Sequence, residues 1–87
     1  MGTKSKPGKF DCYAKAAPDE PVFVLLARDL SAPGTIREWA ARREREIRAG
    51  RKPESDRAMI EEALVCATDM ERWRRDQADK PAAKKSK

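Results

Sequence analysis

The sequence of 87 residues has no histidine, only two cysteines, four glycines and few aromatic residues. Without histidine, the commonest general base and the commonest metal ligand among side chains are both missing. Cys12 and Cys66 lie far apart and have no companions at zinc-binding spacing, and no glycine-rich phosphate loop is present. No catalytic constellation remains, so we expect a protein that is not an enzyme and that holds no metal or cofactor.

The few cysteines and the short apolar runs indicate in which compartment the protein acts. No secretory segment would carry Cys12 and Cys66 into an oxidising compartment, so we expect two free thiols, with Cys66 buried in a helix. The longest apolar run, residues 22–27, has six residues, whereas a membrane-spanning helix needs about 20. We therefore expect a cytoplasmic protein with no membrane segment.

The net charge of +5 is unevenly distributed. Residues 1–9 and 80–87 carry seven lysines and no acidic residue, whereas residues 10–79 carry 13 Lys and Arg against 15 Asp and Glu, which leaves −2. We expect one domain, residues 10–79, between two disordered basic tails. The tails could add weak, non-specific attraction to nucleic acid, but a specific reader would carry its basic face on the folded part.

The first part of the expected domain is ambiguous. Residues 10–17 could form an arm or a small strand. Asp19, Glu20 and Pro21 then give the signature of a helix N-terminus. The following VFVLLARD could be a strand or a helix, because its first half favours a strand and its second half a helix. The start signature favours the helix.

Two further helices are expected from periodicity. Apolar residues recur at helical spacing through Ile36, Trp39 and Ile47, after a boundary at residues 31–34. Gly50 should end this helix, and a third should begin at Glu54 or Ser55 and end at residues 80–81. The apolar face of the third helix runs through Met59, Ala63, Cys66, Met70 and Trp73, widened by Ile60, Leu64 and Ala67.

These elements predict an all-α protein, a small three-helix bundle. The third helix has an apolar face too wide for one short pair of neighbours to cover. We therefore expect a second copy of the chain to cover the surplus, giving a homo-oligomer.

Seven residues are candidates for ligand binding: Arg28, Asp29, Gly34, Trp39, Arg43, Trp73 and Arg74. The two tryptophans lie on apolar stripes, where they either pack in the core or stack on a base. Arg28 and Asp29 form a surface pair or a cap, or else bind an anion and a hydroxyl or amide donor. Gly34 lies where small residues and free N–H groups at a helix start suit an anion, although ordinary capping explains the segment equally well.

Arg43 and Arg74 are the most specific of these candidates. Their helical phases direct both toward apolar surroundings, where a guanidinium needs an anionic partner. An internal carboxylate and a ligand phosphate both remain possible acceptors.

The segments DEPVFVLLARD, APGTIREWA and EALVCATDMERWRR resemble a group of small phage and prophage proteins. The resemblance covers about residues 10–75. It implies a phage accessory protein that acts on the host, in multimers that block a host protein or sequester an immune nucleotide signal. No site residue is carried over from it.

Two hypotheses follow. The first is a non-enzymatic counter-defence protein whose homo-oligomer sequesters a phosphate-bearing nucleotide in the host cell. The second is a protein–protein inhibitor that docks its helical face on a host enzyme such as RNA polymerase or a defence nuclease.

Overall fold

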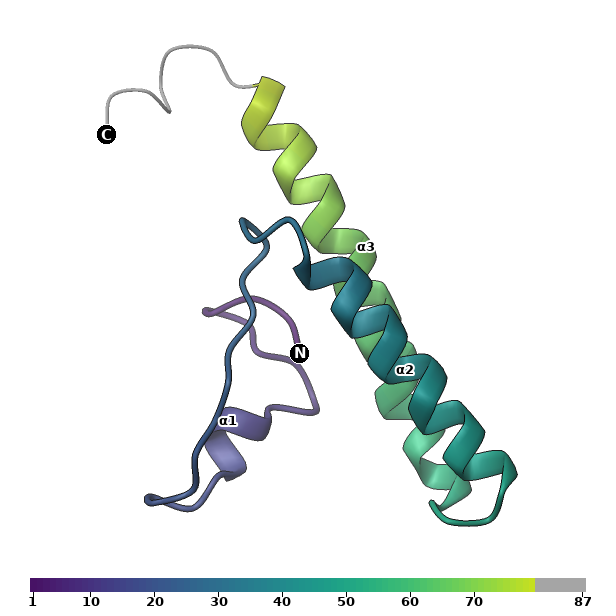
Figure 1. Ribbon diagram of the computed structural model, residues 1–87. Helices are drawn as coiled ribbons and strands as arrows, with labels where there is room; N and C mark the ends of the chain where they lie inside the picture. Colours follow the sequence, from purple (N-terminus) through teal and green to yellow (C-terminus); the bar gives the residue numbers. More distant parts are fainter. Residues whose placement is uncertain (80–87) are drawn as a thin grey trace.

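The computed structural model describes residues 1–79, and in this range the chain is helical and has no strand. Its elements are α1 (Cys12–Lys15), α2 (Ala32–Arg48), the 3₁₀ turn η1 (Glu54–Asp56) and α3 (Arg57–Asp79). Helices α2 and α3 form an antiparallel hairpin, and residues 1–31 lie along one side of it (Figure 1). The predicted all-α class is confirmed for residues 1–79, which are helical and contain three α-helices.

Helix α2 begins and ends where the sequence predicts. Pro33 lies in its first turn, where its missing N–H costs no helical hydrogen bond. At the other end, Gly50 adopts a φ of +79°. The N–H groups of Gly50 and Arg51 donate to the carbonyls of Ile47 and Glu46 at 3.0 and 2.9 Å, the paired bonds of a Schellman motif. This turn reverses the chain toward η1 and α3.

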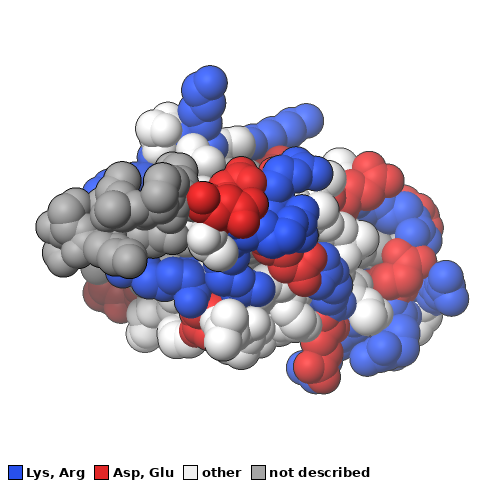
Figure 2. Space-filling view, turned by 90° about the horizontal axis from the view of Figure 1, so that it is seen from above, with Lys and Arg blue, Asp and Glu red and all other residues white. Residues whose placement is uncertain are grey.

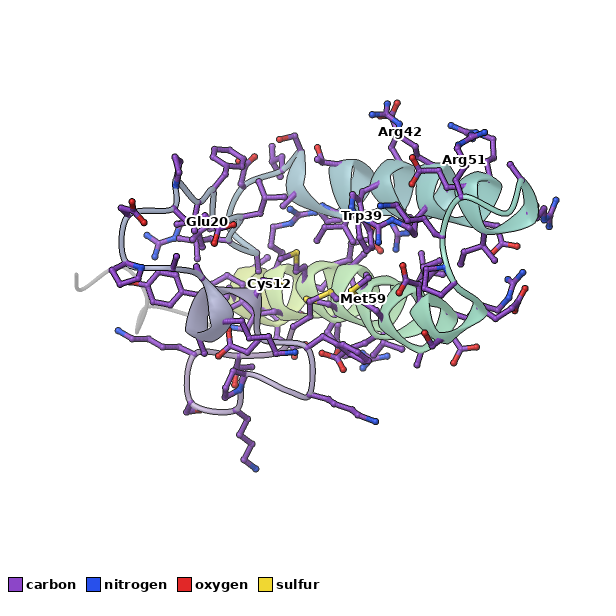
Figure 3. All side chains as sticks on the ribbon, turned by 90° about the horizontal axis from the view of Figure 1, so that it is seen from below. Cys12, Glu20, Trp39, Arg42, Arg51 and Met59 are labelled. Carbon is purple, nitrogen blue, oxygen red and sulfur yellow. The ribbon has the colours of Figure 1, made fainter. Side chains whose placement is uncertain are left out.

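The interface between α2 and α3 is built mainly from alanine. Its buried residues share small size or β-branching and are Ala32, Ala40, Ile47, Ile60, Ala63 and Ala67. Trp39 packs half-buried against this cluster, and Figure 3 shows it pointing from α2 toward α3. No large side chain among the described residues is fully buried. The core is therefore thin, and polar contacts at its edges matter for stability.

The prediction of a helix after Asp19 is wrong. Residues 20–26 have no regular secondary structure, and residues 27–31 form a turn that leads directly into α2. The alternative of a strand is not realised either. In place of a first long helix, the N-terminal region holds only the four residues of α1, within the segment where an arm or a strand was expected.

Local hydrogen bonds explain this difference. The Glu20 carboxylate accepts from the N–H of Ala17 at 3.0 Å, so the predicted helix start closes a turn instead. The Asp29 carboxylate accepts from both the N–H and the hydroxyl of Ser31, at 3.0 and 2.8 Å. Short polar side chains that bond nearby main chain in this way compete with helix formation. Val22 and Val24 also favour extended backbone.

Of the two expected tails, only residues 1–9 belong to the part of the chain that the structure describes. Residues 1–9 form no helix or strand, but the N-terminal amino group contacts Glu62 of α3 at 2.8 Å. Phe10 donates its main-chain N–H to the same carboxylate at 3.4 Å. Disorder of residues 1–9 stays a prediction, and residues 80–87 lie outside the described part of the chain.

Candidate ligand-binding groove

A groove of about 540 Å³ opens between α3 and the N-terminal segments. Its walls come from three stretches of chain: Gly2, Thr3 and Lys4; Leu25, Leu26, Ala27 and Arg28; and Cys66, Asp69, Met70, Arg72, Trp73 and Asp76 of α3. We call it the Trp73 groove. Its size falls within the range of about 300–1,000 Å³ that is usual for small-molecule sites.

The groove combines an apolar floor with charged groups. Trp73 is 47 % exposed, which is unusual for so large an apolar side chain on a packed helix. Met70 and Leu25 are half-buried beside it. Arg72 is exposed, and its only ion pair within residues 1–79 is a surface contact of 3.4 Å with Asp69. Such exposed pairs contribute little and are easily exchanged for another anion.

Two of the seven candidate residues line this groove, Arg28 and Trp73. In the part of the chain that the structure describes, Arg28 makes no ion pair or side-chain hydrogen bond, and Lys4 makes none either. These two cations and Trp73 are therefore available to a ligand.

Trp39 and Arg43 lie on α2, outside the groove. The guanidinium of Arg43 stacks on the Trp39 ring, 5.1 Å from its centroid, and donates to Asp56 Oδ2 at 3.0 Å. It also lies 3.4 Å from Glu46. A smaller pocket of about 200 Å³ adjoins them, with Arg42 and Lys52 on its rim. The sequence leaves an internal carboxylate and a ligand phosphate open as acceptors for Arg43. In the structure the acceptor is an internal carboxylate, that of Asp56.

Arg74 has a different internal acceptor. Its guanidinium donates to the main-chain oxygens of Ala27 and Asp29, both at 3.1 Å. Asp29 itself caps the turn before α2 through Ser31. Arg74 and Asp29 therefore hold one wall of the groove in place and do not face into it.

Gly34 is exposed near the start of α2, and a Cβ atom built there would meet nothing within 4 Å. The position neither requires glycine nor lies at the Trp73 groove. The candidates thus fall into three pairs, which are Arg28 with Trp73 at the groove, Trp39 with Arg43 on α2, and Asp29 with Arg74 at the turn, and Gly34 belongs to none of them. Reasoning from the sequence missed Lys4 and Arg72, because nothing local shows that residues 2–4 lie against α3.

Ion pairs between α2 and α3 shape the electrostatics around the hairpin. Arg37 holds Glu71 through two hydrogen bonds of 2.8 and 2.9 Å and lowers the pKa of that carboxyl. Arg57 likewise lowers the pKa of Glu44. Hydrogen bonds from Ser31 lower the pKa of Asp29, first through the main-chain N–H. Both signs of charge alternate over the described part of the face in Figure 2.

One of the two cysteines, Cys66, lines the groove. Cys66 is half-buried in α3, and burial raises the pKa of its thiol. Cys12 is exposed on α1, and both cysteines are free, whereas Cys66 is only half-buried and not buried as predicted. In residues 1–79 no cluster of three or more ligand side chains could hold a metal ion.

No helix among the described residues combines the length and apolarity that crossing a membrane requires. Comparison with protein families, with curated proteins and with solved structures finds no match to this chain.

Proposed function

We propose that this chain is a non-enzymatic binding protein that captures a phosphate-bearing nucleotide in the Trp73 groove. The observation that carries the proposal is an exposed tryptophan on the wall of an apolar groove that cations reach from three separate segments. Aromatic rings that stack on bases, next to cations that bind phosphate, are the usual elements of such recognition.

Each group has a role in this proposal. The half-exposed indole of Trp73 stacks on the base, and Met70 and Leu25 cover the apolar part of the ligand. Lys4 and Arg72 belong to different segments of the groove lining, so a phosphate that reaches both gains charge-assisted hydrogen bonds from each. Asp69 and Asp76 can accept from amino or hydroxyl groups of the ligand.

The biological role we propose is the sequestration of a nucleotide immune signal by a phage-type protein, with the chain acting as a homo-oligomer. Its support is the resemblance over about residues 10–75 and the lack of a catalytic constellation in the sequence. The expected site at Arg43 and Arg74 has no support, because both guanidinium groups have internal acceptors. The Trp73 groove takes its place.

Calorimetric titration of the full chain with cyclic dinucleotides and ADP-ribose derivatives tests the proposal. One of these ligands should bind, and at about 100 times its Kd it should raise the free energy of unfolding by about 2.7 kcal/mol. Trp73→Ala should weaken binding at least tenfold, and Trp39→Phe, which leaves the groove intact, should not. If no ligand in the series binds, or if Trp73→Ala binds as well as the parent, the proposal fails.

A second candidate is an inhibitor of a host enzyme through protein–protein contact. The observation that favours it is the exposure of Leu64 and Val65 on α3, 40 % and 59 %, outside the Trp73 groove. The variant Leu64→Glu with Val65→Glu should then lose inhibition of a purified host enzyme, for example in an RNA polymerase transcription assay. Nucleotide binding by this variant should be unchanged, so the two candidates can be separated.

A further inference from the structure

The extended segment before the turn, residues 22–26, has an unpaired main chain. Within residues 1–79, its N–H groups form no hydrogen bond, and neither do the carbonyls of residues 21–25. The first main-chain bonds beyond it are those of the turn, where Asp29 donates to the carbonyl of Leu26 at 2.9 Å. The segment therefore presents strand edges with free donors and acceptors.

The side chains of this segment are apolar and exposed. Phe23 is 86 % exposed, Val24 60 %, Val22 51 % and Leu26 49 %. Valine and phenylalanine are strong strand formers, and an extended, apolar, unpaired segment is suited to strand addition. Only Leu25 of the five is half-buried, in the wall of the Trp73 groove. The segment thus lies against its own molecule only at its C-terminal end, where Leu25 and Leu26 line the groove, and leaves its main chain available.

We propose that residues 22–26 pair with the same segment of a second copy, as a two-stranded antiparallel ribbon. The two-fold axis passes between Val24 and its counterpart, so Phe23 lies opposite Leu25 and Val22 opposite Leu26 of the second copy. Pro21 then stands at the first position of the strand, where its missing N–H is tolerated. This pairing satisfies main-chain groups and brings the exposed apolar side chains of the two copies into cross-strand contact.

Charge complementarity selects the second copy as the occupant and favours the antiparallel direction. In the antiparallel pair centred on Val24, the end of the segment that follows Glu20 meets the turn that holds Arg28 in the second copy, so these opposite charges approach each other at both ends of the ribbon. The Glu20 carboxylate is already positioned by the N–H of Ala17 through Oε1, which leaves Oε2 for a partner. A parallel pair would instead bring Glu20 beside Glu20 and Arg28 beside Arg28 of the second copy.

The inference does not rest on nucleotide binding. Arg28 also lines the Trp73 groove, but its guanidinium has five donors and can meet a carboxylate across the ribbon. The phosphate in the proposed function is assigned to Lys4 and Arg72. All measurements below are made without nucleotide, and Trp73→Ala should dimerise like the parent, so failure of one proposal does not imply failure of the other.

Sedimentation velocity of the full chain gives the first test. A dimer should form at micromolar concentration, and Val24→Pro, which removes a ladder N–H, should shift it to monomer with unchanged helical circular dichroism. A strict monomer, or an open-ended series of larger species, overturns the proposal.

Cross-linking gives the second test, in the background of Cys12→Ser and Cys66→Ala. Residues directly opposite in an antiparallel pair have Cβ atoms about 5 Å apart, so Val24→Cys should form a disulfide dimer under mild oxidation. The control is Leu30→Cys, 80 % exposed but outside the paired segment, which should cross-link at least tenfold more slowly. Equal rates for the two variants overturn the proposal.

Charge exchange tests the antiparallel direction. Glu20→Lys and Arg28→Glu should each weaken the dimer about tenfold, and the double variant should regain most of the parent's affinity. A double variant as weak as the single variants shows that the two side chains do not meet across the ribbon and overturns the antiparallel pairing.

Discussion

The Nη1 atom of Arg43 in α2 donates to Oδ2 of Asp56 in η1 at 3.0 Å, and both side chains are 22 % exposed. This pair joins the end of the core helix to the turn that begins α3. Because Trp39 packs on the other side of the guanidinium, the arginine also covers one edge of the thin core.

Replacing Arg43 by methionine should therefore destabilise the unliganded protein. The change keeps much of the apolar stem but leaves the Asp56 carboxylate half-buried without its partner, at a cost of about 1–3 kcal/mol. Urea unfolding followed by circular dichroism measures this cost. The matched control is Arg42→Met, an exposed neighbour that projects away from the hairpin in Figure 3 and should change stability by less than about 0.5 kcal/mol. Equal effects of the two variants would contradict the structural role of Arg43.

Arg74→Met should loosen the N-terminal segment while leaving the hairpin folded. The variant loses the hydrogen bonds to the carbonyls of Ala27 and Asp29. These bonds connect α3 to the turn before α2. Charge-assisted bonds of this kind are worth about 1–3 kcal/mol each. Hydrogen exchange of residues 17–31 should accelerate, whereas the exchange of residues 36–47 in α2 should be unchanged. Arg75→Met, one residue further on, is the control and should leave both regions as in the parent.

The contrast between these two arginines shows how far the sequence could predict the molecule. Helical phase predicts an anionic partner for Arg43 and for Arg74. Arg43 has one in Asp56, whereas Arg74 donates to main-chain carbonyls instead. Helix α2, the stop at Gly50 and the start near Glu54 also followed from local signals. Which acceptor each arginine has depends on the path of the chain between helices, and no periodicity encodes that path.

The N-terminal region could not be predicted for the same reason. Residues 19–29 carry a helix start signal, but their turn is fixed by Asp29 with Ser31 and by Arg74 from α3. The apolar stripe leaves core packing and stacking on a base both open for Trp73. Because Ala63 and Ala67 let α2 approach closely on one side of α3, Trp73 lies outside that contact and remains half-exposed at the groove.

Acidification should weaken the hairpin in a defined pH range. The folded-state pKa values of Glu44, Glu71 and Asp29 are lowered by hydrogen bonds from Arg57, Arg37 and Ser31 respectively. A lowered folded-state pKa stabilises the fold above the ordinary carboxyl pKa of about 4, and this contribution is lost as the pH falls through the folded values. The melting temperature should therefore be nearly constant from pH 7 to 5 and fall steadily below that.

Two variants test whether the Glu71 carboxylate contributes to the fall of the melting temperature below pH 5. Glu71→Gln should lower the melting temperature at pH 7 and flatten its fall toward pH 3, because the neutral amide has no proton to take up. Glu38→Gln, exposed on α2 with no ion pair among the described residues, should retain the slope of the parent. If the Glu71→Gln slope equals that of the parent, the pair with Arg37 does not contribute to acid sensitivity.

The two cysteines should differ in reactivity, and one of them should report on the groove. Burial raises the pKa of the Cys66 thiol, so less of it is thiolate at pH 8, whereas Cys12 is exposed on α1. Iodoacetamide followed by mass spectrometry of the peptides should show Cys12 modified several times faster. Because Cys66 lines the Trp73 groove, a nucleotide bound there should slow its alkylation further and leave Cys12 unaffected. A nucleotide that binds by calorimetry but protects neither thiol would place its site elsewhere on the molecule, and the Cys66→Ala variant would then bind it as tightly as the parent does.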